Sequence, residues 1–517
     1  MVLTVAGIVV KILGGVNRIL LSRLLGGEGI GLYQMAYPMY ILLLSIVGAG
    51  IPIAVSIMVA EQAARGNYSG TRRIFHVTLA FMAVIALLCG LGMVLGARAL
   101  IATGLVSDER AYWPLVVLAP ALSLSVLTCC FRGYFQGLQL MTPTALSQMV
   151  DQFIRVCVML TLAWILLPYG LVPAASGAAF GAVPGAAAGL CVIAVLYIRH
   201  EKKERLADEG TFVPLRALAV INRLIVLAVP VAAANMLLPA VASIDLFIVP
   251  RRLIAAGYTG HEATALFGYL SGMANGLVQL PAILTMALAT SLVPAVSAAC
   301  ASGRGDLVLA RTHTAMRIAC VITIPASLGL AVLAVPISRL LYATPAAGPS
   351  ICVLGLSVFL IGLQQVTGGL LQGLGHTAIP LYNMAAAAVV KITLSWYLTA
   401  LPWLAEVGAA WATNADLAIA AALNLYFARR YCQYTVQWLY IGKLFLAAAA
   451  MAGTAWFVHK GLSAVTPDAL ATVAAMGVAA LIYLICLFAF RAVDADDVAK
   501  VPVVGHRMYQ WVKRLEK

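Results

Sequence analysis

Apolar runs of about 20 residues or more follow one another along the whole 517-residue chain, with short polar connectors between them. About 20 consecutive apolar residues are enough for one helix to cross the hydrocarbon core of a bilayer. The pattern therefore predicts an all-α integral membrane protein. Its expected spans are fourteen helices near 2–24, 31–60, 74–103, 112–137, 142–167, 174–198, 216–246, 264–290, 307–341, 350–374, 377–400, 406–428, 441–460 and 468–490.

The composition supports this prediction. The chain is 63% hydrophobic and only 10% charged, with a mean hydropathy of +0.99, whereas soluble domains are about 45–50% apolar. The first run carries Lys11 and Arg18 and lacks a small-residue cleavage site, so we expect a first spanning helix rather than a cleaved signal peptide.

The lysines and arginines predict the orientation. With both termini on the cytoplasmic side, the inner segments hold nineteen of the basic residues and the outer segments seven, as expected when basic residues concentrate in cytoplasmic loops. The net charge of +14 is then explained by topology and by contact with anionic lipid headgroups, and we expect no nucleic-acid binding. The cysteines show no metal-binding spacing.

Two stretches of the chain resemble each other. Gln136-Gly137-Leu138 recurs as Gln372-Gly373-Leu374, 236 positions later, and Pro143 corresponds to Pro380 after one insertion. Arg155 and Lys391 are again separated by 236 positions. These matches predict an internal duplication of helical hairpins.

A second pair of matches follows the same order. "IPIAVS" at 51–56 resembles "VPAVS" at 293–297, and "RGN" at 65–67 resembles "RGD" at 304–306. Parallel repeats of six helices are typical of transporters that rock between two states around a central pathway. The expected organisation is an N-lobe at 1–200, a cytoplasmic linker at 201–215, a C-lobe at 216–430, two further helices at 431–492 and a basic cytoplasmic tail at 493–517.

Several charged residues fall inside the predicted spans. A charge at the centre of a bilayer costs about 2.5–3.5 kcal/mol even on insertion scales, so such residues usually face a cavity or a partner. Asp151 and Arg155 are spaced i,i+4, which is compatible with a local ion pair as well as with a role in a cavity. The candidate cavity residues are Arg18, Arg23, Arg132, Asp151, Arg155 and Lys391.

A cavity rich in arginine suits a diphosphate, because the guanidinium group offers two parallel donors to phosphate oxygens and stays charged. An exporter of cationic drugs would need buried acids instead. A membrane enzyme would need a polar outer loop with catalytic groups, yet the outer loops are short and His261-Glu262 is the only suggestive pair. We therefore expect a transporter and not an enzyme.

The stretches "RGYFQGLQLMTPTALSQMVDQFIRV", "LLGGEGIGLYQMAYPMY" and "SIDLFIVPRRL" resemble the stage V sporulation protein B and polysaccharide-biosynthesis branch of the multidrug/oligosaccharidyl-lipid/polysaccharide exporter superfamily, which is related to the lipid II flippases. The resemblance covers essentially the whole chain. It implies a two-lobed flippase of the bacterial inner membrane for undecaprenyl-diphosphate-linked precursors, with the last two helices forming a groove for the lipid tail.

The resemblance also implies roles for particular residues. Arg18 and Arg23 match two essential first-helix arginines of the lipid II flippases, and Asp245, Asn383 and Thr413 match ligands of a sodium site. Oxygen ligands suit such a hard cation. Two departures from the pattern are the missing arginine near "AGIPIAV" and Gly276 in place of an eighth-helix arginine.

The sequence thus predicts a monomeric flippase for a lipid-linked oligosaccharide, lipid II or a related precursor, in cell-wall or polysaccharide biosynthesis. It would contact membrane lipids and need no cofactor beyond a sodium ion or proton as coupling ion. The alternative is a cation-coupled multidrug antiporter of the same fold, with Asp245 as its ion site.

Overall fold

The structure is a computed structural model that describes residues 2–207 and 216–490. Every regular element in these ranges is a helix, and they contain no strand, which confirms the all-α prediction. Residues 208–215 of the predicted linker and the predicted basic tail at 493–517 lie outside the described residues.

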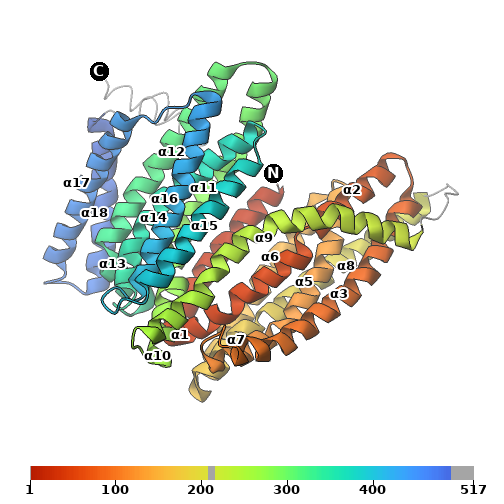
Figure 1. Ribbon diagram of the computed structural model, residues 1–517, viewed down its shortest axis with the longest axis horizontal. Helices are drawn as coiled ribbons and strands as arrows, with labels where there is room; N and C mark the ends of the chain where they lie inside the picture. The colour runs from red at the N-terminus through yellow and green to blue at the C-terminus, as the bar shows by residue number, and fades with distance from the viewer. Residues whose placement is uncertain (1, 208–215, 491–517) are drawn as a thin grey trace. The chain divides into compact units, whose positions relative to one another are not determined.

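The helices cluster into two compact units (Figure 1). The first unit comprises residues 1–276 together with 392–409. Its helices are α1 (Val2–Gly48), α2 (Ile51–Ala64), α3 (Tyr68–Ala102), η1 (Glu109–Ala111), α4 (Tyr112–Val117), α5 (Ala119–Gly137), α6 (Met141–Leu166), η2 (Leu167–Tyr169), α7 (Leu171–Phe180), α8 (Ala182–Ala207), α9 (Ala217–Ala255), α10 (Gly260–Phe267) and η3 (Gly268–Ala274).

The second unit comprises residues 277–391 and 410–517. Its helices are α11 (Asn275–Ala301), α12 (Gly305–Val332), α13 (Ala334–Tyr342), α14 (Gly348–Gly373), α15 (Ala378–Leu398), α16 (Glu406–Cys432), α17 (Trp438–Leu462) and α18 (Asp468–Ala489). Helix α12 packs against α14 and α17, and α17 packs against α18 (Figure 1). Helix α9 clusters with the first unit, whereas the predicted C-lobe begins at 216.

Eleven segments of the described chain are long and apolar enough to cross a bilayer. Their number makes the chain a multi-pass membrane protein but differs from the predicted fourteen for three reasons. The first two predicted helices are merged into one segment, Val9–Ala64, and α9 contributes only the shorter apolar stretch Ala217–Ala233. The third reason is α16, which carries the polar residues Asn414, Asp416 and Asn424 and is not one of the eleven segments.

The merged first segment has a sharp break at Gly26. Its φ of 67° and ψ of −174° are accessible to glycine because it has no Cβ atom. The break falls between the predicted spans 2–24 and 31–60. The second predicted span is itself divided, because α1 ends at Gly48 and α2 begins at Ile51.

Glycines give the two predicted hairpin stretches the same packing. In the first unit, a Cβ atom at Gly137 of α5 would lie 2.8 Å from the Val59 Cβ of α2. In the second unit, a Cβ atom at Gly373 of α14 would lie 2.8 Å from the Val296 Cβ of α11. Only glycine permits this close approach of the helices, and it does so at corresponding positions of both units.

The turns after these glycines also match. The backbone N–H of Leu140 donates to the Phe135 carbonyl and that of His376 to the Leu371 carbonyl, each at 2.9 Å. The predicted duplication of the hairpin is therefore visible in the backbone of each unit.

The second pair of sequence matches aligns the two units differently from the glycine contacts. The glycine contacts pair Val59 with Val296, 237 positions apart, whereas pairing "IPIAVS" with "VPAVS" sets Ser56 against Ser297, 241 apart. Gly66 and Gly303, also 237 apart, share φ values of 70° and 68°, so the predicted match of "RGN" with "RGD" was wrong by two positions. Short Ala, Val and Ser matches arise by chance in such apolar sequence.

Candidate functional site

Three charged residues meet between α5 and α6 of the first unit. Arg155 Nη2 donates to Asp151 Oδ1 at 2.9 Å, and Arg155 Nε reaches the same oxygen at 3.3 Å. Arg132 Nη2 of α5 lies 3.9 Å from Asp151 Oδ2. The predicted i,i+4 ion pair is thus present, and a second arginine extends it. We call Arg132, Asp151 and Arg155 the charged cluster.

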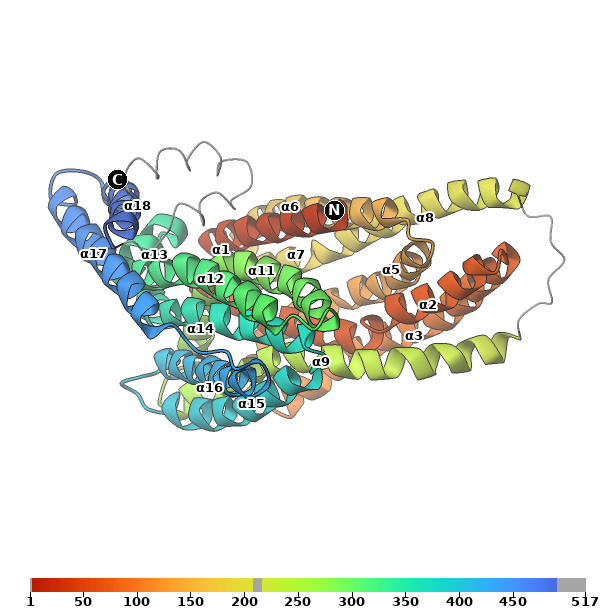
Figure 2. The same cartoon turned by 90° about the horizontal axis from the view of Figure 1, so that it is seen from above.

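Helix α8 covers the cluster with glycines. A Cβ atom at Gly185 would lie 2.7 Å from the Arg155 Cβ, and one at Gly189 would lie 2.9 Å from the Asp151 Cβ. The small residues of α8 therefore let it pack directly on the charged turn of α6 (Figure 2). As a result Arg155 is only 9% exposed.

The charge of the cluster is unbalanced, because two guanidinium groups share one carboxylate. Arg132 Nε is buried and makes no hydrogen bond within the described residues. The arrangement therefore keeps one net positive charge and an N–H donor inside a membrane-spanning region, which are the features that an anionic group would recognise.

Helix α1 brings three tyrosines to the cluster that the sequence analysis did not single out. Tyr33 and Tyr37 stack with ring centroids 5.3 Å apart, and Tyr37 and Tyr40 lie 5.8 Å apart. Helix α1 packs against α5 and α6, the two helices that carry the cluster, and the Tyr40 hydroxyl forms a hydrogen bond with Ser125 of α5 at 2.9 Å. The spacing i, i+4, i+7 was visible in the sequence, but it is also the spacing of ordinary buried helix faces.

The two first-helix arginines differ in their surroundings. Arg18 is half-buried on α1, the helix that carries the tyrosines. Its neighbour Asn17 is buried and donates to Met159 Sδ of α6 at 3.0 Å. Arg23 is exposed, and no hydrogen bond or ion pair joins it to the cluster within the described residues.

In the second unit, Lys391 and Asn383 of α15 are both buried. Asn383 Nδ2 donates to Asn424 Oδ1 of α16 at 2.8 Å. Asn424 was missed by the sequence analysis, since an isolated asparagine in a helix carries no motif. The second unit thus has a buried lysine on α15 and a neutral amide pair that joins α15 to α16.

The predicted sodium ligands are divided between the units, with Asp245 in the first and Asn383 and Thr413 in the second. The sodium site therefore stays a prediction. Within the described ranges, no group of three or more His, Cys, Asp or Glu side chains could hold a metal ion.

A polar network ties α1, η1 and α10 together in the first unit. Arg110 donates to Asp108 and also to Glu28, and Glu28 contacts His261 Nδ1 at 2.6 Å. Thr264 donates to Asp108 at 2.7 Å. Burial alone would raise the pKa of Asp108, but the hydrogen bonds from Arg110 and Thr264 hold that pKa below its usual value.

The same network explains the pair that had suggested an enzyme. Glu262 forms a capping box with Thr259 at the start of α10, and His261 contacts Glu28. Both side chains therefore have structural partners, and the two do not form a catalytic pair.

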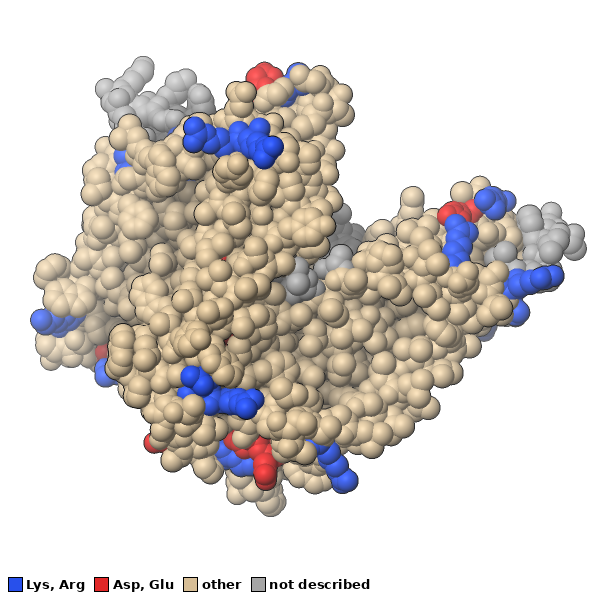
Figure 3. All heavy atoms as spheres, viewed as in Figure 1, with Lys and Arg blue, Asp and Glu red and all other residues tan. Residues whose placement is uncertain are grey.

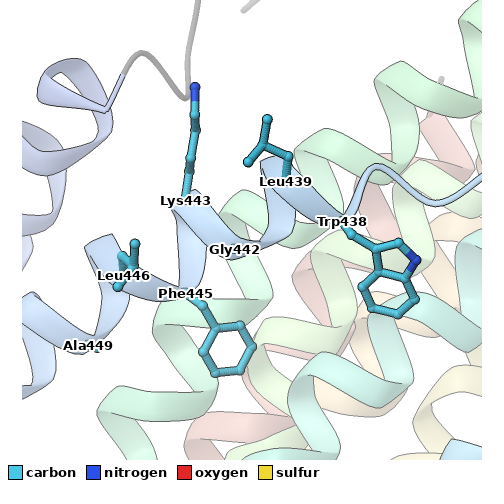
Figure 4. Close-up of a pocket in the computed structure, with 7 residues that line it drawn as sticks. All are labelled: Trp438, Leu439, Gly442, Lys443, Phe445, Leu446 and Ala449. Carbon is cyan, nitrogen blue, oxygen red and sulfur yellow. The ribbon is translucent and has the colours of Figure 1, made fainter.

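An apolar groove of about 480 Å³ runs along the first half of α17 (Figure 4). Figure 4 shows Trp438 and Phe445 on one side of this helix and Lys443 on the other. Charged groups are otherwise sparse on the visible helix walls and gather toward helix ends (Figure 3). The groove thus combines an apolar wall with one cation.

Comparison with known proteins gives two family matches. The family model described as "Polysaccharide biosynthesis protein" matches residues 1–300, and that described as "Lipid II flippase MurJ" matches residues 263–480. Together they cover both units.

Individual relatives agree with these matches. Stage V sporulation protein B of Bacillus subtilis is 28% identical over 98% of this chain and 97% of its own length. The lipid II flippase MurJ of the same organism is 27% identical over 76% of this chain and 75% of its own length.

Solved structures share the fold. An inward closed structure of lipid II flippase MurJ has a TM-score of 0.71 at 15% identity and covers 94% of this chain and 98% of its own. An inward-facing multidrug resistance MATE family transporter of the MOP superfamily has a TM-score of 0.68 at 16% identity, covering 82% and 94%.

Proposed function

The chain belongs to the polysaccharide biosynthesis protein family, and from this premise we propose that it is a flippase for a lipid-linked oligosaccharide. Its substrate would be lipid II or a related undecaprenyl-diphosphate precursor, carried from the inner to the outer leaflet of a bacterial cytoplasmic membrane by alternating access. The activities named among its relatives and neighbours are those of flippases and transporters, and the chain is a transporter rather than an enzyme.

The charged cluster is the observation that carries this proposal. Burying two arginines with one aspartate leaves one positive charge without a counter-charge in the cluster. A diphosphate would supply that counter-charge and accept hydrogen bonds from guanidinium N–H groups such as Arg132 Nε. Arg18, beside the tyrosines, would add a further cation during binding.

The cluster also argues against the multidrug antiporter. A cationic drug would meet the net positive charge of Arg132 and Arg155, and like charges repel strongly in a medium of low dielectric constant. The same positive charge would attract an anionic headgroup. The geometry therefore favours the flippase over the antiporter.

The groove on α17 suits the lipid tail of such a substrate. Trp438 and Phe445 offer apolar contacts to a prenyl chain, and Lys443 would attract an anionic lipid headgroup. We place the tail here and the headgroup at the charged cluster, with both termini in the cytoplasm and a monomer as the working unit.

The return step would use a coupling ion. Asp245 would bind this ion, sodium or a proton, and Arg23 in the first unit and Lys391 in the second would each add a positive charge.

A cellular experiment tests the proposal. The gene is expressed in a bacterial strain depleted of its own lipid II flippase, and the accessibility of the precursor in the outer leaflet is measured with a membrane-impermeant reagent. Wild-type protein should restore outer-leaflet precursor, and Arg155→Gln should restore less than a tenth of it. Equal restoration by Arg155→Gln, at equal membrane abundance, would contradict the role of the cluster.

A further inference from the structure

Tyr33, Tyr37 and Tyr40 form an aromatic column on one face of α1. The first two rings are nearly parallel, with 18° between their planes, and the third is tilted by 37° from the second. Residues spaced i, i+4 and i+7 share one face of a helix, so the column is a continuous surface along α1, which packs against the helices α5 and α6 that carry the charged cluster.

The two end rings of the column are fixed in place. Tyr33 is 7% exposed and Tyr40 is 1% exposed. The Tyr40 hydroxyl also forms a hydrogen bond with Ser125 of α5 at 2.9 Å. The central ring of Tyr37 is half-buried, so it is held by its neighbours while part of its surface remains accessible.

The groups around Tyr37 are those that a carbohydrate needs. Each pyranose ring has apolar C–H faces and a rim of hydroxyl groups. A fixed aromatic ring matches the C–H face by shape and apolar contact. Asp151 of α6, a helix that packs against α1, can accept hydrogen bonds from hydroxyls, and Arg155 of the same helix can donate to hydroxyls or to phosphate.

We propose that Tyr37 is a sugar-stacking platform that receives the hexose directly attached to the diphosphate, while Arg132 and Arg155 hold the phosphates. This inference rests on the proposed flippase function and adds a basis for selecting the glycan. The Tyr37 side chain is neutral and contributes contact area rather than charge. It therefore distinguishes a lipid that carries a sugar from one that carries the diphosphate alone.

Two synthetic probes separate these contributions in the purified full-length protein. One is a short-chain prenyl diphosphate bearing N-acetylglucosamine, and the other is the same prenyl diphosphate without a sugar. Affinity for each is measured in detergent by titration calorimetry for wild type, Tyr37→Leu and Tyr37→Phe. Tyr169→Leu, in the exposed turn η2, is the matched control for the loss of a tyrosine.

Tyr37→Leu should bind the sugar-bearing probe about three- to tenfold more weakly, the range expected from one aromatic contact. It should bind the bare diphosphate as wild type does, which also shows that the variant is folded. Tyr37→Phe should retain most of the affinity for the sugar-bearing probe, because the ring remains, and Tyr169→Leu should match wild type for both.

Equal affinity of wild type and Tyr37→Leu for the sugar-bearing probe would overturn the platform while leaving the flippase proposal standing. An equal loss for both probes would also overturn it, since Tyr37 would then act on the diphosphate site alone. If wild type bound neither probe, the proposed function would fail, and the platform with it.

Discussion

The hairpin of α5 and α6 and the hairpin of α14 and α15 have the same backbone turn but different buried chemistry. Gly137 and Gly373 make matching close contacts. Yet the first hairpin buries an ion cluster, Arg132, Asp151 and Arg155, whereas the second buries Lys391 and an amide pair, Asn383 with Asn424. The packing positions are thus alike in the two hairpins while the buried polar groups differ, and the first hairpin is the one for which we propose an anion-binding role.

The largest expected effect is at the acid of the first hairpin. Asp151→Asn removes the only carboxylate of the cluster and leaves two arginines facing each other, which should destabilise the protein by about 3–5 kcal/mol. The matched change in the second hairpin, Asn383→Ala, removes one neutral hydrogen bond and should cost about 1–2 kcal/mol. Thermal unfolding of both variants in detergent measures the difference in destabilisation. Equal destabilisation by the two substitutions would contradict the electrostatic distinction between the hairpins.

The shared packing positions should respond alike. Gly137→Ala and Gly373→Ala each place a methyl group within 3 Å of backbone oxygen and a valine side chain, and overpacking of this kind costs about 1–3 kcal/mol. We expect the two variants to lower the unfolding temperature by similar amounts. A clear loss for one and none for the other would show that the two contacts are not equivalent.

Substitutions in the two turns should change the stability by smaller amounts and in opposite directions. Gln139 has a φ of 59° and its counterpart Gly375 a φ of 87°, and this left-handed region costs a residue with a Cβ atom about 1–2 kcal/mol. Gln139→Gly should therefore stabilise the first hairpin by about 1 kcal/mol, and Gly375→Gln should destabilise the second by about as much. Paired unfolding curves measure both, and shifts of the same sign would contradict the shared turn geometry.

The smallest effect concerns pH at the network around Asp108. Its pKa is lowered in the folded protein, so its contribution to stability is complete above the usual aspartate pKa of about 3.9 and is lost as pH falls through the lower folded value. Asp108→Asn should lower the unfolding temperature at pH 7 and have less effect near pH 3. An effect of Asp108→Asn that grows as pH falls below about 4 would contradict this sign.

The sequence predicted those features of the two hairpins that depend on a regular local spacing of residues. Apolar runs located the helical hairpins, and the i,i+4 spacing of Asp151 and Arg155 had allowed the ion pair that the structure shows as one of two roles. The tyrosines of α1 escaped notice because buried helix faces have the same spacing, and Asn424 escaped because its partner is distant in the chain. The register of "IPIAVS" was wrong because matches among small apolar residues carry little information.

Translocation by the purified protein tests the central claim most directly. Wild type and the double variant Arg132→Gln/Arg155→Gln are reconstituted in liposomes with a fluorescent prenyl diphosphate-linked sugar, and a membrane-impermeant quencher reports its movement between leaflets. We predict translocation by wild type above protein-free liposomes and a rate at least tenfold lower for the double variant at equal protein incorporation. Equal rates for the two proteins would contradict the claim that the charged cluster carries the diphosphate.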